Sequence, residues 1–246
     1  MRVLICTPTF LEAMNIEDFL RRARAAAPDA DILVIDDNSS DGTADIAERV
    51  GAEVGHVQVL RRPSKRGLGS AYRAGFSVGI DRGYDVLIQI DADLSHDPRA
   101  IPLLLRELEQ GADLAIGSRY VPGGSIPHWP WYRRALSKYG NLYTGLMLRT
   151  GVADATSGYR AYRADMLKAI DFASTRAKGY GFQIELAYRV SMWGGRIAEV
   201  PITFTDRERG KSKMSAAVMI EEMGLVTLWG VRDRLGAGRK HVKNGA

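Results

Sequence analysis

DVLIQIDADLSHD, residues 85–97, is the stretch that decides the fold of this chain. It begins as an apolar run typical of a buried β-strand and ends in two carboxylates, Asp91 and Asp93, separated by one alanine. Two carboxylates so close repel each other unless a cation lies between them. Mg²⁺ and Mn²⁺ bind carboxylate and phosphate oxygens together, so this strand end predicts a metal site completed by a diphosphate. His96 and Asp97 are expected to shape the turn and cap the next helix rather than to react.

Strand and helix patterns alternate over the first 120 residues. Short apolar runs are separated by amphipathic stretches and by one segment rich in glycine and alanine, which is expected to pack closely on a sheet. This alternation predicts an α/β fold with a mostly parallel central sheet and helices on both faces. We expect strands at 2–6, 31–36, 57–61, 85–91 and 112–120, and helices at 12–27, 43–50, 68–83 and 100–111.

Charged residues follow several of the expected strands. Asp36 and Asp37 end the second strand, Asp91 and Asp93 the fourth, and Arg119 the fifth. Open parallel sheets bind ligands at the carboxyl ends of their strands, so these side chains are expected to meet at one edge. A single acidic strand end is usually only a turn or a helix cap, but charges of both signs on one edge favour a binding site.

The acidic segment 36–42, DDNSSDG, has two interpretations. Its carboxylates can accept hydrogen bonds from a nucleobase or a ribose. Alternatively, it forms an Asx turn in which Asp41 caps the following helix. The sequence has neither G-x-G-x-x-G after the first strand nor G-x-x-x-x-G-K-[ST], so a dinucleotide oxidoreductase and a P-loop enzyme lose their main support.

The pattern changes after residue 120. A loop rich in glycine and proline carries Trp129, Trp131, Arg133 and Arg134 and leads into an expected helix at roughly 133–149. No linker or repeat divides the chain, so we expect one domain over 1–236 and a basic, flexible tail at 237–246. Between helix and tail we expect a polar loop at 154–163, a strand at 196–204, a basic loop at 205–214 and a last helix at about 214–235.

Composition narrows the classes of function. The chain has 246 residues, is 46% hydrophobic and carries a net charge of +5, which suits one large folded domain with an anionic partner. One cysteine, Cys6, excludes an internal disulfide framework and a cysteine-based zinc site. Nucleic acid is disfavoured as the partner because the acidic strand ends would repel its phosphates. The sequence shows no signal peptide and no run of about 18 apolar residues, so we expect a cytoplasmic location.

Eight motifs, in order over nearly the whole chain, resemble those of glycosyltransferase family 2, which has the GT-A fold. Within that family the sequence resembles the polyprenyl-phosphate (dolichyl-phosphate) mannose synthases of the single-domain type. The motifs are TPTFLE (7–12), VIDDNSSDGT (34–43), RPSKRGLGSAYRAGF (62–76), IDADLSHDP (90–98), GSRYVPGG (117–124), DATSGYRAYR (154–163), GYGFQIE (179–185) and EVPITFTDRERGKSKM (199–214).

The resemblance implies inverting transfer of mannose from GDP-mannose to a polyprenyl phosphate, with Mg²⁺ or Mn²⁺ as the metal. It implies Asp91, Asp93 and Arg119 as catalytic residues. Asp91, Asp93 and Ser95 are implied at the metal, although Ser95 stands where some relatives carry glutamine. Leu11 stands where relatives often have asparagine, which weakens any polar role there. The implied nucleotide-sugar-binding residues are Pro8, Phe10, Glu12, Ile35, Asp37, Asp91, Ala92, Asp93, Arg119, Arg207 and Lys213.

A lipid acceptor needs a phosphate site and a route to the membrane. For the phosphate, the resemblance implies Arg119, Arg133, Arg134 and Ser137. The aromatic group Trp129, Trp131 and Tyr132, with the helix after it, is expected either to anchor the protein in the membrane interface or to pack on the sheet, and the last helix is a second candidate. We therefore expect peripheral association with the cytoplasmic face of the membrane, for which a separate membrane-anchoring protein is a further expected partner.

Two alternatives remain open at this stage. The first keeps the fold and the lipid acceptor but uses a UDP-sugar, with glucose or an amino sugar, because base and sugar selection depend on pocket shape. The second is a nucleotide-sugar-binding protein without turnover. The intact DAD motif and the cations of the loops disfavour this second alternative.

Overall fold

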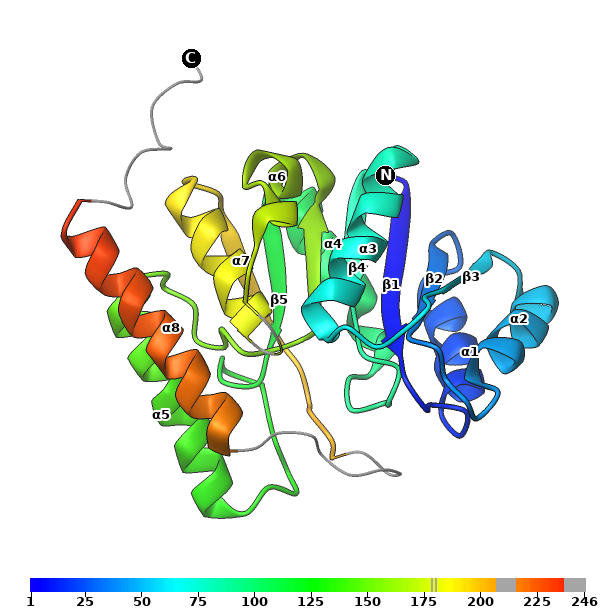
Figure 1. Cartoon of the computed structure of the whole chain (residues 1–246), viewed down its shortest axis with the longest axis horizontal. Helices are drawn as coiled ribbons and strands as arrows, with labels where there is room; N and C mark the ends of the chain where they lie inside the picture. Colours follow the sequence, from blue (N-terminus) through cyan, green and yellow to red (C-terminus); the bar gives the residue numbers. More distant parts are fainter. Residues whose placement is uncertain (178, 180, 207–215, 237–246) are drawn as a thin grey trace.

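The computed structural model describes residues 1–177, 179, 181–206 and 216–236. Within these residues the chain forms a seven-stranded sheet in the order β3-β2-β1-β4-β6-β5-β7, flanked by helices (Figure 1). The strands are β1 (Val3–Thr9), β2 (Asp31–Asp36), β3 (Val57–Arg61), β4 (Val86–Gln89), β5 (Leu114–Ser118), β6 (Arg160–Arg163) and β7 (Ile197–Pro201). The helices are α1 (Ile16–Ala26), α2 (Thr43–Val54), α3 (Leu68–Asp81), α4 (Ile101–Glu109), α5 (Trp131–Leu148), α6 (Ala164–Ala169), α7 (Gly181–Met192) and α8 (Ala216–Arg234), with 3₁₀ turns η1 (Pro98–Ala100) and η2 (Phe172–Ser174).

Strand direction confirms the expected mostly parallel sheet. Neighbouring strands are parallel except at β6, which pairs antiparallel with β4 and with β5. The strands β1, β2, β4 and β5 therefore run in one direction, and their carboxyl ends meet at the lower edge of the sheet in Figure 1. We call this the carboxyl edge; it is where open parallel sheets bind ligands.

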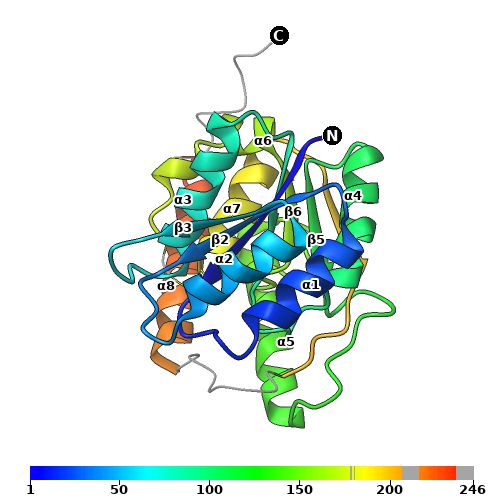
Figure 2. The ribbon, with the colours of Figure 1, turned by 90° about the vertical axis from the view of Figure 1, so that its right-hand side faces the viewer.

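Helices cover both faces of the sheet (Figure 2). A layer of hydrophobic side chains lies on each face. In β1, Val3 and Ile5 pack with α1, α2 and α4, whereas Leu4 and Cys6 pack with α3, α6 and α7. The division follows from the strand period of two, which sends successive side chains to opposite faces. Cys6 is a buried thiol, as expected, and burial raises its pKa. The helices α5 and α8 lie side by side beyond the sheet.

The expected polar loop at 154–163 is wrong in its second half, where β6 forms between β4 and β5. Arg160 is fully buried in this strand, and its guanidinium donates to the backbone carbonyls of Ala155, Ser157 and Gln183. A charged side chain can enter a sheet interior when carbonyl acceptors replace water around it. The polar sequence of β6 therefore gave no pattern from which this central strand could be predicted.

Two helices, α6 and α7, were not expected from the sequence. In α7 the residues Gly181–Ala187 are all buried, including polar Gln183 and Glu185. The segment consequently lacks the one-sided apolar pattern that identifies a surface helix. The other expected elements are present with shifted ends: the first helix begins at Ile16, and β4 ends at Gln89. The division into one domain (1–236) and a tail stays a prediction, since 237–246 lie outside the described residues.

The close packing expected for the glycine-rich helix is confirmed in α3. A β-carbon on Gly75 would lie 2.5 Å from the Cδ1 atom of Ile35 and 3.2 Å from the Sγ atom of Cys6. Both neighbours are fully buried, so neither can move without disturbing the core. The glycine lets α3 approach the sheet, which brings Tyr72, one turn earlier, to the carboxyl edge.

Gly75→Ala should therefore lower the free energy of unfolding by about 1–3 kcal/mol through overpacking. Gly224→Ala in α8 is the matched control, because nothing lies within 4 Å of its β-carbon position. The control should be neutral or stabilising by up to about 1 kcal/mol, since alanine is the better helix former. Urea denaturation of both variants checks this, and equal stabilities would contradict the close packing of α3.

Candidate active site at the carboxyl edge

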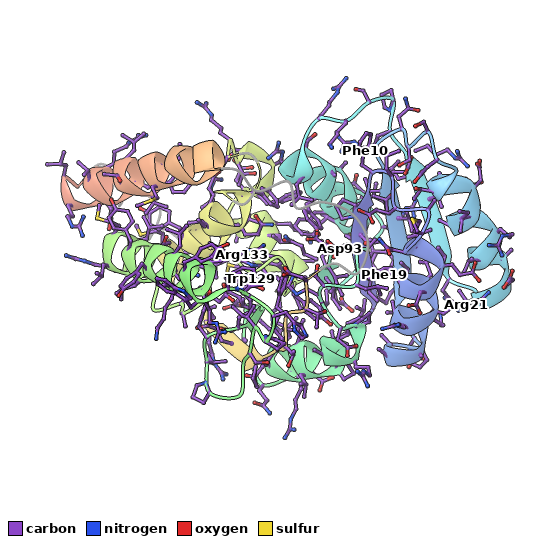
Figure 3. The ribbon with its side chains drawn as sticks, turned by 90° about the horizontal axis from the view of Figure 1, so that it is seen from below. Phe10, Phe19, Arg21, Asp93, Trp129 and Arg133 are labelled. Atoms are coloured by element: carbon purple, nitrogen blue, oxygen red, sulfur yellow. The ribbon has the colours of Figure 1, made fainter. Side chains whose placement is uncertain are left out.

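The carboxyl edge brings the charged strand ends together, as the sequence predicted. Figure 3 looks onto this edge, with Asp93 between Phe10 on one side and Trp129 and Arg133 on the other. Asp93 is 4% exposed and Arg119 is 8% exposed, so both charges are largely removed from water. Charges held this way act strongly on a ligand that enters between them.

The turn after β4 holds its two carboxylates with specific donors. Asp91 accepts a hydrogen bond of 3.0 Å from the hydroxyl of Tyr72. Asp93 Oδ1 accepts from the backbone N–H of Ser95 at 3.0 Å and from the Ser95 hydroxyl. Burial, and then the negative charge of Asp91, raise the pKa of Tyr72, so its phenol stays protonated and remains a donor. Leu94, at a φ of 61°, makes the turn tight. These hydrogen bonds fix the two carboxylates in the turn formed by residues 91–95, which we call the acidic turn.

A basic residue faces this turn from the end of β5. The guanidinium of Arg119 donates to both carboxylate oxygens of Asp154 at 2.7 Å, and its backbone N–H donates to the same carboxylate at 2.9 Å. Arg119 also donates to the Thr156 hydroxyl at 2.7 Å. Burial raises the pKa of Asp154, but Arg119 outweighs it and leaves the pKa below its ordinary value. Asp154 is in turn fixed by Glu199 of β7, whose carboxylate accepts from the backbone N–H groups of Ala153 and Asp154.

Aromatic rings surround the same guanidinium. Its carbon lies 5.4, 5.6 and 5.5 Å from the ring centroids of Tyr120, Trp129 and Phe204. Such rings attract a cation through their negative faces and keep water away. Arg119 is thus held in one orientation by a bidentate ion pair and by neighbouring rings.

The other side of the edge carries a second group of charges, after β1 and β2. Asp37 pairs with Arg62 at 2.7 Å, and both side chains are at least nine-tenths buried. Burial raises the pKa of Asp37, and the positive charge of Arg62 opposes this. The ammonium of Lys65 lies 3.9 Å from the centroid of the Phe10 ring. An aromatic face, a carboxylate and two cations together can stack on and hydrogen-bond a nucleobase.

The remaining residues of the segments predicted near the nucleotide differ in their burial and in their hydrogen-bond partners. Asp41 accepts from the backbone N–H of Thr43, the first residue of α2, and so forms the expected Asx turn, although Gly42 holds the N-cap position itself. Glu12 accepts from the side chain of Asn15 at 2.8 Å. Ile35 and Ala92 are buried in the two hydrophobic layers, so a contact of either with a nucleotide would have to use the backbone. Pro8 is half-buried.

A cavity of about 330 Å³ opens beside Arg119, between α5, α7 and α8. Its lining is polar near Arg119 and at the first turns of α5, with Arg133, Ser137 and Thr156. Farther along α5 the lining becomes apolar and aromatic. The other lining residues are Trp129, Leu136, Tyr139, Gly140, Tyr143, Thr144, Ile184, Met223 and Val226. A cationic end joined to an apolar trough suits a ligand with an anionic head and a hydrocarbon chain.

The structure decides two expectations from the sequence. Of the two alternatives for Trp129, an interfacial anchor or an internally packed ring, the structure supports packing: Trp129 is 5% exposed, because its ring packs against Phe204 and lies under Arg133. His96 does not cap the next helical element; Asp97 caps the 3₁₀ turn η1, by accepting from the backbone N–H of Arg99. His96 is buried against Tyr159 and Phe204, and burial lowers its pKa to about 4.

Other predicted site residues keep the status of predictions. Ser95 donates to Asp93, so in this structure it orients the carboxylate, and its role as a metal ligand is untested. Arg134 donates to the carbonyl of Trp129, outside the lining of the cavity. Arg207 and Lys213 lie outside the described residues.

Several residues of the edge were missed from the sequence. Asp154 lies in a quoted motif, DATSGYR, but nothing in the spacing links it to Arg119, 35 residues earlier. Arg62 and Lys65 belong to RPSKRG, where three cations before a helix could have suggested an anion site. Tyr72 and Asp206 gave no signal, because their partners, Asp91 and Arg133, meet them only in the folded chain.

Solved structures share this fold at low sequence identity. A Mycobacterial protein superposes with a TM-score of 0.65 at 18% identity, covering 99% of this chain and 76% of that one. The mannosyltransferase PcManGT from Pyrobaculum calidifontis, solved with GDP-Man and Mn²⁺, has a TM-score of 0.59 at 14% identity and covers 96% of this chain and 73% of its own. The fold is therefore that of the GT-A glycosyltransferases, as the sequence resemblance implied.

Sequence comparison identifies the family. The model of "Glycosyl transferase family 2" matches residues 4–171. The undecaprenyl-phosphate mannosyltransferase of Micrococcus luteus is 50% identical over 95% of this chain and 96% of its own length. The polyprenol monophosphomannose synthase of Mycolicibacterium smegmatis is 48% identical over 98% and 92%, respectively. The dolichol-phosphate mannosyltransferase of Pyrococcus furiosus is 34% identical over 90% of this chain and 61% of its own length. The chain belongs to glycosyl transferase family 2, which makes it a glycosyltransferase and confirms the expected enzyme class.

The buried ion pair at Arg119 yields a stability prediction. Asp154→Asn should lower the free energy of unfolding by about 3–5 kcal/mol, because it leaves the charge of Arg119 buried without its counter-ion. Asp165→Asn removes the same charge from an exposed pair with Lys168 and should change stability by less than about 0.5 kcal/mol. Chemical denaturation at neutral pH compares the two; an Asp154→Asn protein as stable as the control would contradict the account of Arg119.

Proposed function

We propose that the protein transfers mannose from GDP-mannose to a polyprenyl phosphate, with inversion at the sugar carbon and with Mg²⁺ or Mn²⁺ as cofactor. The observation that carries the proposal is that three features lie at one edge of the sheet. They are the acidic turn, the group of Phe10, Asp37, Arg62 and Lys65 suited to a nucleobase, and the cationic cavity with its apolar trough. The relatives at 48–50% identity act, by their names, on undecaprenyl phosphate and polyprenol, and this supports the choice of acceptor.

The donor nucleotide is assigned to the side of the edge after β1 and β2. Asp37 offers a carboxylate to the N–H groups of guanine, while Arg62 and Lys65 offer donors to its carbonyl oxygen and ring nitrogen. Phe10 offers a face on which the base can stack. Arg207 and Lys213 stay part of the proposal from the sequence, as contacts to the donor phosphates.

The acidic turn fits a divalent metal. Asp91 and Asp93 are two carboxylates on one short turn, and Mg²⁺ is commonly held by one or two carboxylates together with substrate phosphates. Over the residues that the structure describes, no group of three or more histidine, cysteine or acidic side chains forms a metal cage. A metal bound here would offset the negative charge that grows on the departing GDP.

The acceptor is assigned to the cavity. Arg119, Arg133 and Ser137 at its polar end suit a phosphate, since guanidinium groups form paired, charge-assisted hydrogen bonds with phosphate oxygens. The trough between α5 and α8 suits the first prenyl units, which are hydrocarbon. Arg134 stays part of the proposal from the sequence; its guanidinium donates to the backbone carbonyl of Trp129 and does not line the cavity.

The chemistry then needs no general base. A phosphate oxygen of the acceptor is already anionic and attacks the anomeric carbon directly, while the bond from that carbon to the GDP oxygen breaks and GDP takes the electron pair. Arg119, held rigid by Asp154, orients the attacking phosphate, and this positioning lowers the barrier. The surrounding rings exclude water that would otherwise compete as the nucleophile.

Access to a lipid substrate is assigned to α5 and α8, at the cytoplasmic face of the membrane. No helix within the described ranges is long and apolar enough to span a bilayer. Exposed apolar side chains instead follow α5 and α8: Trp131, Tyr132, Leu136, Tyr139, Leu142, Leu146, Met223, Leu228, Val231 and Leu235. An apolar surface of this kind on a protein with an excess of basic residues suits peripheral binding to anionic lipid. A separate membrane-anchoring protein remains a proposal from the sequence.

The direct test is transfer of labelled sugar to a short polyprenyl phosphate, with GDP-mannose and UDP-glucose compared side by side. The proposal expects product from GDP-mannose alone, lost with EDTA and restored by Mn²⁺ or Mg²⁺. Product from UDP-glucose alone would overturn the donor and favour the UDP-sugar alternative. No product with either donor, from protein that binds GDP, would favour a binding protein.

Asp93→Asn should lower the turnover rate by at least about 10²-fold at every pH. The reason is that Asp93 is proposed to act through a metal, and an amide cannot replace its charge at any pH. Initial rates across a pH series check this. Activity that returns as the pH is raised would mean that Asp93 acts as a base instead.

The surface of α5 gives a prediction for lipid binding. Replacing Trp131 and Tyr139, which are 79% and 69% exposed, by alanine should weaken co-sedimentation with anionic vesicles several-fold. Trp193→Ala, at the end of α7, removes an exposed tryptophan elsewhere and is the control. If the control weakens binding as much as the pair, α5 is not the contact surface.

A further inference from the structure

The segment after β7 crosses the carboxyl edge between the two halves of the site. The N–H of Ile202 donates to the carbonyl of Ser118, and the N–H of Thr205 donates to the carbonyl of Ser95 in the acidic turn. Phe204 forms an isolated β-bridge with His96. The backbone of 202–206 is therefore fixed to the end of β5 and to the turn that bears Asp93.

Asp206 extends from this segment to the other side, toward the cavity. Its Oδ1 atom accepts from the indole N–H of Trp129 at 2.8 Å and from the guanidinium of Arg133 at 3.2 Å. The same guanidinium lies 3.9 Å from the centroid of the Trp129 ring. One carboxylate oxygen thus joins a buried tryptophan to a cation that lines the cavity.

This contact has a consequence for any anion that enters the cavity. Arg133 is one of the cations that the proposed function assigns to the acceptor phosphate, yet its guanidinium is paired with a carboxylate of the chain itself. A phosphate and a carboxylate repel each other and compete for the same N–H donors. The pair is 31% and 44% exposed, so it is weak enough to give way.

We propose that Asp206 is an internal counter-ion of Arg133 and that the acceptor phosphate displaces it from that guanidinium. Its hydrogen bond to Trp129 keeps the carboxylate close by, so that Arg133 is held in position rather than left free to swing into water. The inference rests on the proposed function, because it takes the phosphate to be that of a prenyl phosphate.

The variant Asp206→Asn isolates this role. Asparagine keeps an oxygen that accepts from the indole of Trp129, but it removes the charge that competes for Arg133. The control is Asp165→Asn, which removes one negative charge from the exposed pair with Lys168 on α6. It shows how far the net charge of the protein alone changes the binding of anions. A third protein, Arg133→Gln, removes the shared cation.

Titration calorimetry with farnesyl phosphate, with farnesol as the ligand that lacks the phosphate, measures the effect. Asp206→Asn should bind farnesyl phosphate about two- to fivefold more tightly, in keeping with the modest strength of a half-exposed ion pair. Asp165→Asn should bind it like the unchanged protein, and Asp206→Asn should have no effect once Arg133 is glutamine. Weaker or unchanged binding by Asp206→Asn would overturn the inference.

The indole N–H of Trp129 supplies a readout independent of affinity. The chain has four tryptophans, so its ¹H–¹⁵N spectrum has few indole resonances to assign. Trp129 lines the cavity, so both ligands can shift its resonance. In the unchanged protein the shift should be larger with farnesyl phosphate than with farnesol, and this difference should be smaller in Asp206→Asn. A Trp129 resonance that stays in place while farnesyl phosphate binds would contradict displacement of Asp206. If farnesyl phosphate binds no better than farnesol, the phosphate site of the proposed function fails, and the inference fails with it.

Discussion

The buried ion pair between Arg119 and Asp154 is the interaction on which the site most depends. It fixes the end of β5 to the loop before β6, and Glu199 extends the connection to β7. A lone guanidinium at this depth would be costly, and a lone carboxylate equally so. The pairing holds the Arg119 guanidinium in a fixed position beside the cavity, and the remaining parts of the carboxyl edge are arranged around it.

The fold and half of the site could be predicted from the sequence, because they rest on local patterns. Short apolar strands such as β2 and β3 end where expected, and Asp91, Asp93 and Arg119 reach one edge because parallel strands share a direction. The rest depends on contacts between distant segments. The polar strand β6 and the buried helix α7 have no periodicity that identifies them. Trp129 illustrates the same limit, since a tryptophan in a loop looks like a membrane anchor until its partner Asp206, 77 residues later, is in place.

The two halves of the edge are not independent in this structure. The segment 202–206 contacts the acidic turn through Thr205 and the cavity through Asp206. The metal that would hold the donor diphosphate is assigned to the acidic turn, and the lipid phosphate is assigned to the cavity. The segment 202–206 therefore gives the chain a short physical connection between the two proposed substrate sites. A family 2 glycosyltransferase that must hold a soluble donor against a membrane lipid gains from such a connection, because the reacting groups must meet in line before water reaches them.

The central claim is that the acidic turn and the cationic cavity form one site, with metal and acceptor phosphate close together. The most direct measurement is the ³¹P relaxation of farnesyl phosphate bound to the protein with GDP and Mn²⁺. The account predicts strong paramagnetic broadening of the farnesyl phosphate signal that is lost in Asp93→Asn, which retains the cavity but not the proposed metal site. A farnesyl phosphate signal that stays sharp while the lipid is bound, or broadening that survives Asp93→Asn, would contradict it.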